Sequence, residues 1–335
     1  MLLPLSISHH AYMFRLCLIF TVCLSHCPVA YFKPKLNMFL KSYLPVMLAL
    51  LSVHLLSAQY TETINSNRPG QSQGAFSVGT GVYQAELGGF YNDESHNLRF
   101  TETTGMGVDF AIRAGFWREQ FEVNVSGTYL YEEVTPTAGN AASFNQSGFP
   151  IVTAGIKYLV YDPYKNAKDE VNLYSYHDNH RFKWKTLIPA VSLYAGTNYV
   201  YSKNNPFLPN SQTGLSPKAI VITQNNWGPF VWVNNFIADQ LMTDFPTYAW
   251  ITTLTHSFNA RIAAFAEYQM LHSDIYADDL FRFGGAYLFT KDLQVDINAL
   301  VNFKDTPQRF QVGVGVSYRF DKHSVDEEIL AEPAN

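Results

Sequence analysis

The most constraining feature of the sequence is a strict two-residue alternation near its C-terminal end. Over residues 311–320, every second position is apolar or aromatic, and the positions between are glycine or polar. A strand that is solvated by lipid on one face and by a polar lumen on the other has this period. A soluble edge strand can alternate too, so the interpretation depends on finding the pattern along most of the chain.

Alternating segments recur at regular intervals from residue 82 onward. They make twelve expected strands, an even number, as in single-chain bacterial outer-membrane barrels. We therefore predict an all-β fold, a transmembrane antiparallel β-barrel of about 12 strands that occupies residues 81–320. The expected strands are 82–91, 105–116, 120–131, 150–161, 187–200, 217–224, 228–237, 247–258, 260–271, 279–289, 292–302 and 309–320.

The connections between these segments alternate in length, which also favours a barrel. Short connections are expected at the periplasmic end and long ones outside, as in outer-membrane barrels. A soluble secreted β-sandwich, the alternative fold, predicts short loops at both ends. The short connections are 117–119, 225–227, 258–259 and 290–291, and the long ones are 92–104, 132–149, 201–216, 238–246, 272–278 and 303–308.

One connection breaks this rule. Residues 162–186 belong to the periplasmic set but are long, charged and aromatic. Either they form a periplasmic or in-plane excursion, or they conceal another hairpin and the strand count is wrong by two.

The N-terminal 58 residues contain basic but no acidic side chains. From Met38, Lys41 precedes an apolar stretch, and the small residues Ser57 and Ala58 suit cleavage before Gln59. We therefore expect a signal peptide at 38–58. Residues 1–37 carry a separate apolar run, explained most simply by translation that starts at Met38, with a tandem signal as the alternative. Residues 59–80 are expected to form a periplasmic or in-barrel segment, and residues 321–335 an acidic periplasmic tail.

Composition after cleavage excludes several classes of function. All three cysteines (Cys17, Cys23 and Cys27) lie in the leader, so the mature chain has no disulfide, thiolate metal site or cysteine nucleophile. Removing the leader's four basic residues takes the net charge from −5 to −9, which argues against a nucleic-acid partner. The expected partners are outer-membrane lipid and a small solute, and a monomer is favoured.

Two further sequence patterns carry little chemistry. His177 and His180 flank Asp178 in a loop without a third ligand nearby, so a metal site there is disfavoured. The histidines are scattered along the sequence, and Gly79-Thr80-Gly81 opens a strand with no helix behind it. We expect no catalytic residue, no metal and no cofactor.

The opening of the mature chain resembles a known family. Asn67-Arg68-Pro69-Gly70-Gln71-Ser72, followed by Gly81-Val82-Tyr83-Gln84-Ala85-Glu86, is similar to the start of the outer-membrane transporter family named for a component of the phenol meta-cleavage pathway. Segments 161–164, 183–185 and 235–239 look like the form found in Bacteroidetes. Asn67 stands where the family usually has Asp, and the chain continues 15 residues past Phe320. The resemblance implies a Gram-negative outer-membrane transporter without supplying a substrate.

The polar faces of the expected strands carry charges of both signs. They form either a selective constriction or paired charges that fill the interior structurally. The lumen-facing candidates by alternation are Glu86, Asp109, Arg113, Glu122, Lys157, Arg261, Glu267, Arg282, Asp292, Asp296 and Arg319.

The segment Asn67 to Gly79 is expected to sit in or just beneath the barrel and to restrict its lumen. It is too polar to span a membrane and leads into the first strand from the periplasmic side. Arg68 is the plug candidate, with Glu86 and Glu122 as carboxylates to hold it. The alternative is a periplasmic leader without contact to the lumen.

The sequence thus favours an outer-membrane channel or transporter for a small, hydrophobic or aromatic solute. A barrel of twelve strands lies between the filled eight-stranded and the open sixteen-stranded cases. The alternative is a non-transporting envelope scaffold or an accessory barrel of a secretion machinery, which would act through its outer loops.

Overall fold

The computed structural model describes residues 63–139, 141–164, 187–201, 204–208 and 214–322, all within the compact unit Ser57–Asn335. No helix in these ranges is long and apolar enough to cross a membrane. The strands are β1 (Val82–His96), β2 (Thr101–Gly115), β3 (Phe121–Pro136), β4 (Phe144–Gly148), β5 (Val152–Tyr161), β6 (Ala190–Val200), β7 (Gly214–Trp227), β8 (Phe230–Asp239), β9 (Thr247–Ser257), β10 (Ile262–Ser273), β11 (Ala277–Thr290), β12 (Leu293–Asn302) and β13 (Gln308–Asp321).

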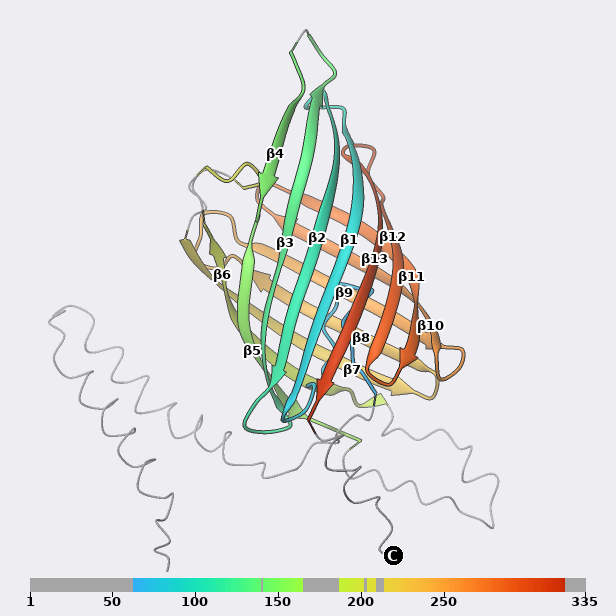
Figure 1. Cartoon of the computed structure of the whole chain (residues 1–335). Coiled ribbons are helices and arrows are strands. Elements are labelled where there is room, and N and C mark those ends of the chain that lie inside the picture. Colours follow the sequence, from blue (N-terminus) through green and yellow to red (C-terminus); the bar gives the residue numbers. More distant parts are fainter. Residues whose placement is uncertain (1–62, 140, 165–186, 202–203, 209–213, 323–335) are drawn as a thin grey trace, which may run out of the picture. The chain divides into compact units, whose positions relative to one another are not determined.

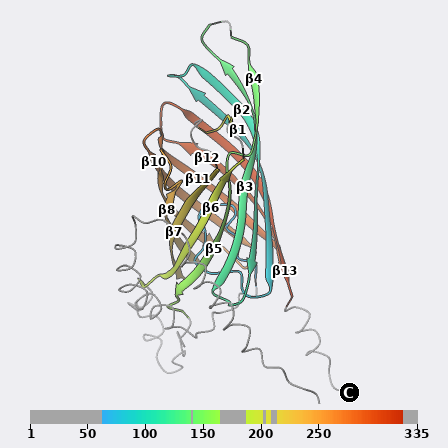
Figure 2. The same ribbon diagram turned by 90° about the vertical axis from the view of Figure 1, so that its left-hand side faces the viewer.

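The strands close into one antiparallel barrel (Figures 1 and 2). Neighbours in sequence pair with one another, and β1 closes on β13 from Val82↔Asp321 to Ser95↔Gln308. Both β4 and β5 pair with β3, so together they make one barrel strand, interrupted where Pro150 cannot donate a ladder hydrogen bond. With β4 and β5 counted as one, the barrel has twelve strands, which confirms the predicted fold class and number.

The long periplasmic connection adds no strand to the described sheet. β5 and β6 pair with each other directly, from Val152↔Tyr199 to Tyr161↔Val191. Residues 165–186, where an additional hairpin was the alternative, lie outside the described residues.

The outward face of the wall is apolar and the inward face is polar. In β12, Ile297 is 57% exposed, whereas its neighbours Asp296 and Asn298 are 6% and 7% exposed. Leu87 of β1 and Val314 of β13 are likewise exposed on the outside. A closed barrel satisfies all its backbone groups internally, and this apolar exterior suits lipid, so the protein is an outer-membrane barrel.

Two of the expected outer loops are wrong. Residues 92–104 and 132–149 were expected to be loops, but β1, β2 and β3 extend through much of both, and β4 lies within the second. This part of the sheet projects beyond the remaining strands (Figure 1). The expected turn at 225–227 is also wrong, because these residues end β7 and the turn is Gly228-Pro229, with Gly228 at φ 58°.

Replacing Ile297 by arginine is expected to destabilise the folded barrel by about 2–4 kcal/mol, because the charge enters lipid near the middle of β12. Leu293→Arg on the same face, at the periplasmic end of β12, is the matched control and should cost roughly 0–1 kcal/mol. Denaturant titration in lipid vesicles measures both. Equal costs at the two positions would contradict the lipid-facing assignment.

Candidate functional site inside the barrel

The chain before β1 runs through the interior of the barrel, where it is drawn in blue in Figure 1. Residues 63–81 form no helix or strand, so their backbone N–H and C=O groups need partners other than a ladder. Inward side chains of the barrel strands supply many of these partners. We call residues 63–80 the interior segment.

Glu267 of β10 holds the middle of the interior segment. Its carboxylate accepts hydrogen bonds from the backbone N–H groups of Gln71, at 2.9 Å, and Ser72, at 3.2 Å. Arg282 of β11 donates to the same carboxylate at 2.6 Å. A Cβ at Gly70 would lie 2.6 Å from Glu267 Oε2, so glycine allows this close approach.

Amide and hydroxyl side chains of the barrel bond the backbone N–H and C=O groups of Gln73 and Ala75, as a neighbouring strand would in a sheet. Asn235 of β8 accepts from Gln73 N at 2.7 Å and donates to Gln73 O at 2.9 Å. Gln224 of β7 accepts from Ala75 N at 2.9 Å, and Ser192 of β6 donates to Ala75 O. These three barrel residues were missed by sequence reasoning, which selected charges only. Their inward positions in the alternation were the available signal.

Ala75 also anchors the interior segment through apolar contact. It is fully buried in a cluster with Leu159, Tyr194 and Ile222, and Phe76 packs against the same cluster. The interior of this barrel is therefore partly a hydrophobic core, shared between the wall and the segment.

A buried charge network surrounds Glu122 of β3. Arg113 binds its carboxylate with Nε and Nη2 at 2.8 and 3.0 Å, and Lys157 Nζ lies 3.1 Å from Oε2. Arg113 also lies 3.3 Å from Glu86 of β1. The network reaches the interior segment through Val78 N, which donates to Glu122, and through Lys157, which donates to the carbonyls of Gly74 and Phe76. Buried charges of both signs are thus paired.

Arg68 is held by a different carboxylate from the expected ones. Its Nε and Nη2 donate to Asp296 of β12 at 3.2 and 3.1 Å, a bidentate pair. Glu86 and Glu122, expected to hold it, instead accept backbone N–H groups of Asn67 and Val78. The expectation of Arg68 bound to either residue is therefore wrong, because charge alone does not tell which strand the segment faces.

Two glycines make room for the Arg68 side chain. Gly88 of β1 and Gly315 of β13 are direct partners across the closing strand pair. A Cβ at Gly88 would lie 2.2 Å from Arg68 Nη1, and one at Gly315 would lie 2.2 Å from Nε. The guanidinium thus occupies the space that two side chains would otherwise fill.

The remaining expected lumen residues lie at different levels. Asp109 accepts a hydrogen bond from Thr128 at 2.6 Å, and Asp292 pairs with Arg319 at 2.8 Å near the turn after β11. Arg261 is exposed in the turn between β9 and β10, away from the other charges, because the alternation was counted past the end of the strand.

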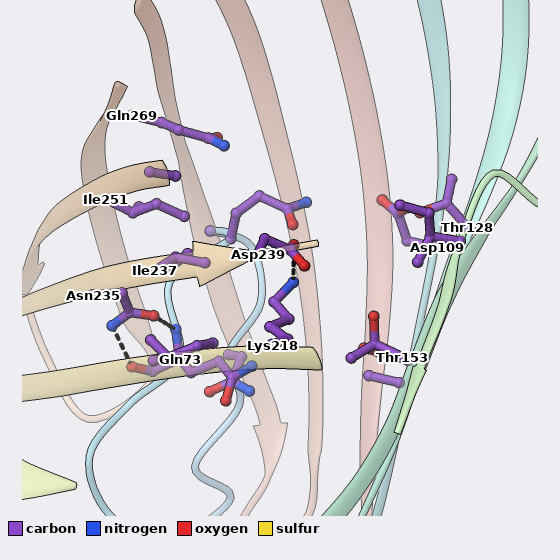
Figure 3. Close-up of a pocket in the computed structure, with 18 of the residues that line it drawn as sticks. Gln73, Asp109, Thr128, Thr153, Lys218, Asn235, Ile237, Asp239, Ile251 and Gln269 are labelled. Carbon is purple, nitrogen blue, oxygen red and sulfur yellow. Dashed lines mark hydrogen bonds and ion pairs between the residues drawn. The ribbon is translucent and has the colours of Figure 1, made fainter. Parts of the chain in front are cut away.

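A cavity of about 330 Å³ lies beside the interior segment, toward the long-loop end of the barrel. Figure 3 shows Ile237 and Ile251 on one side and Asp109, Thr128 and Thr153 on the other, with Gln73 of the segment also in its lining. Lys218 and Asp239, which the sequence did not single out, form an ion pair of 2.8 Å in the same wall. Among the described residues there is no group of three or more His, Cys, Asp or Glu side chains that could hold a metal. His177, Asp178 and His180 lie outside them.

Gly88→Ala is expected to expel the Arg68 guanidinium and to loosen the interior segment. A Ser72→Cys reporter measures this, since no other cysteine follows Cys27, and its reaction with a water-soluble maleimide should be several-fold faster in the Gly88→Ala background. Gly89→Ala is the matched control, because nothing lies within 4 Å of a Cβ there. Equal labelling rates in the two backgrounds would contradict the role of the glycine gap.

Solved structures that resemble this chain include proteins described as channels and porins. An outer membrane channel from Pseudomonas putida F1 shares 9% identity, with 77% of this chain and 100% of that chain covered, at a TM-score of 0.49. The KdgM porin in complex with disordered oligogalacturonate shares 10% identity over 70% and 99% of the two chains, at a TM-score of 0.39. The CymD monoaromatic hydrocarbon channel shares 9% over 73% and 90%, at a TM-score of 0.38.

At these identities the likeness concerns the fold alone. The comparison with curated proteins gave no match. The family model described as "Putative MetA-pathway of phenol degradation" matches residues 66–320, which is most of the sequence and includes Arg68 and all the barrel strands up to Phe320. The chain therefore belongs to this family.

Proposed function

We propose that the protein is an outer-membrane channel for a small solute and that the interior segment is a plug that restricts its lumen. The observation that carries the proposal is the number of barrel residues that bond to the interior segment. Every barrel strand except β11 bonds the segment directly, and Arg282 of β11 pairs with Glu267, which does. The barrel residues whose side chains hydrogen-bond to the interior segment are Gln84, Glu86, Arg113, Glu122, Lys157, Ser192, Gln224, Asn235, Thr253, Glu267, Gln294, Asp296 and Ser317.

The lumen width supports a channel. Eight-stranded barrels are filled by their own side chains, whereas this lumen admits a length of main chain together with a cavity. Displacement of that chain would leave a polar path lined by residues that now bond to it. Most of its contacts with the wall are hydrogen bonds and ion pairs, which water can replace, and its apolar contacts are those of Ala75 and Phe76 with the cluster around Leu159.

The cavity supports a solute that is in part apolar. Ile220, Ile237 and Ile251 present aliphatic surface to it, while Thr128 and Thr153 present hydroxyl groups. Pockets that bind small molecules combine apolar surface with placed polar groups, and in this lining the polar side chains predominate. No chemical step is proposed, only binding and passage.

Flux through the purified chain in liposomes tests the proposal. Reconstituted protein should accelerate the efflux of small trapped solutes above that of protein-free vesicles. The scaffold alternative predicts no efflux for the wild-type chain and none for a variant without the interior segment. That pair of results would overturn the channel.

A further inference from the structure

Asp109 differs from the other carboxylates inside the barrel. Its side chain accepts a hydrogen bond at Oδ1 from Thr128, and no described lysine or arginine forms an ion pair with it. The other inward carboxylates around the interior segment have cationic partners. These pairs are Glu86 with Arg113, Glu122 with Arg113 and Lys157, Glu267 with Arg282, Asp296 with Arg68, and Asp239 with Lys218.

Asp109 lines the cavity beside the interior segment. The charged groups in that lining are Glu86, Asp109 and Asp239 against Arg68 and Lys218. Glu86, Asp239, Arg68 and Lys218 each form an ion pair with another residue, whereas Asp109 has no ion pair among the described residues and is attracted only at longer range by Arg68 and Arg282. The Asp109 carboxylate would repel an anion in the cavity, whereas it would attract a cation and form an ion pair with it.

Part of the cavity wall, on the side away from Asp109, is aliphatic. Ile237 and Ile251 lie across the cavity from Asp109 in Figure 3, and Ile220 belongs to the same lining. A volume of about 330 Å³ is at the lower end of the range for small-molecule sites. The occupant is therefore small, with one cationic end and one apolar end.

We propose that this cavity is a binding site for small cationic amphiphiles, in which an ammonium group donates to the free oxygen of Asp109 and the apolar part lies against Ile220, Ile237 and Ile251. The inference rests on the proposed channel function and names the class of solute that its lumen selects. A carboxylate beside a ligand ammonium makes a charge-assisted hydrogen bond, which is stronger than a bond to a neutral hydroxyl.

Calorimetric titration of the purified full-length protein with three probes of one skeleton tests this site. The probes are 2-phenylethylamine, 2-phenylethanol and phenylacetate. We expect the amine to bind about tenfold tighter than the alcohol, and the acid to bind weakest. Asp109→Asn should bring the amine to the affinity of the alcohol and leave the alcohol unchanged. Asp292→Asn, far from the cavity in the turn after β11, should keep the preference for the amine.

A second variant guards against misfolding of Asp109→Asn. Ser126 is a neighbour of Thr128 on the same inward face of β3, and its β2 partner is Ala111, two residues from Asp109. Ser126→Lys brings a built-in ammonium to Asp109 and should abolish the preference for the amine. Equal binding of amine and alcohol to the wild type, or an undiminished preference in a folded Asp109→Asn or Ser126→Lys variant, would overturn the site.

Failure of this inference is distinguishable from failure of the channel. Liposome efflux of glucose, a neutral solute that does not cross the bilayer unaided, measures passage without the ammonium contact. Wild-type protein that passes glucose but binds the amine no tighter than the alcohol refutes the cationic site alone. Protein that passes no glucose, with or without the interior segment, refutes the channel.

Discussion

Removal of residues 63–78 is expected to raise the single-channel conductance of the barrel several-fold. The interior segment occupies the lumen between the periplasmic turns and the cavity, and its deletion leaves polar groups that water can solvate. The carboxylate of Glu267 would lose two backbone donors, and Glu122 would lose Val78 N. Both carboxylates keep their cationic partners, Arg282 and Arg113, so the wall itself should remain folded.

A length-matched control separates the loss of bonds from the loss of chain. Replacement of residues 66–78 by a Gly-Ser sequence of equal length removes Arg68 and the apolar contacts of Ala75 but keeps a tether before β1. We expect conductance between the wild-type and deletion values, with frequent transitions. Planar-bilayer recordings measure all three proteins. A correctly folded deletion variant with wild-type conductance would show that the segment does not restrict the lumen.

Glu122→Ala is expected to destabilise the folded barrel by about 3–5 kcal/mol, the cost typical of removing one member of a buried ion pair. Glu122 is fully buried, and its loss leaves Arg113 and Lys157, which are 1% and 0% exposed, without their main anionic partner. The segment would also lose the acceptor for Val78 N.

The control for this variant lies on the same strand. Glu133 is exposed toward the outer end of β3, so Glu133→Ala should change stability by less than about 0.5 kcal/mol. Glu122→Gln keeps an acceptor oxygen and should fall between the two. Urea titration in lipid vesicles, followed by tryptophan fluorescence, gives the three free energies of unfolding. Similar costs for Glu122→Ala and Glu133→Ala would show that the network contributes little.

The strands were predictable where lipid is the solvent of one face. In β12 and β13, a shift of one residue would place Asp296 or Arg319 in hydrocarbon, so the sequence must alternate and the register can be read directly. The same reasoning fails at the outer ends of β1 and β2. Residues 92–96 and 101–104 are strands made of polar side chains only, so no alternation of apolar and polar side chains marks them in the sequence.

The candidate site was less predictable than the wall. Alternation placed Glu122, Glu267 and Asp296 on the inward face, but it contains no information on which strand a segment without regular structure will meet. Arg68 pairs with Asp296 because Gly88 and Gly315 leave space for its guanidinium beside that carboxylate. This space depends on three strands together, β1, β12 and β13, so no single stretch of sequence predicts it. Neutral groups such as Asn235 carry no charge signal, although each can satisfy both a donor and an acceptor of the main chain.

The position of Arg68 has a consequence for biogenesis. The residues that bind its side chain are Gly88 in the first strand and Asp296 and Gly315 in the last two, and Arg68 and Asp296 are 228 positions apart. This binding position therefore does not exist until the C-terminal strands have joined the sheet, and contacts between such distant residues form late. A chain truncated before β12 would show two defects together: unpaired edges at β1 and β11, and an N-terminal segment open to protease. The docking of Arg68 thus marks a barrel whose assembly is complete.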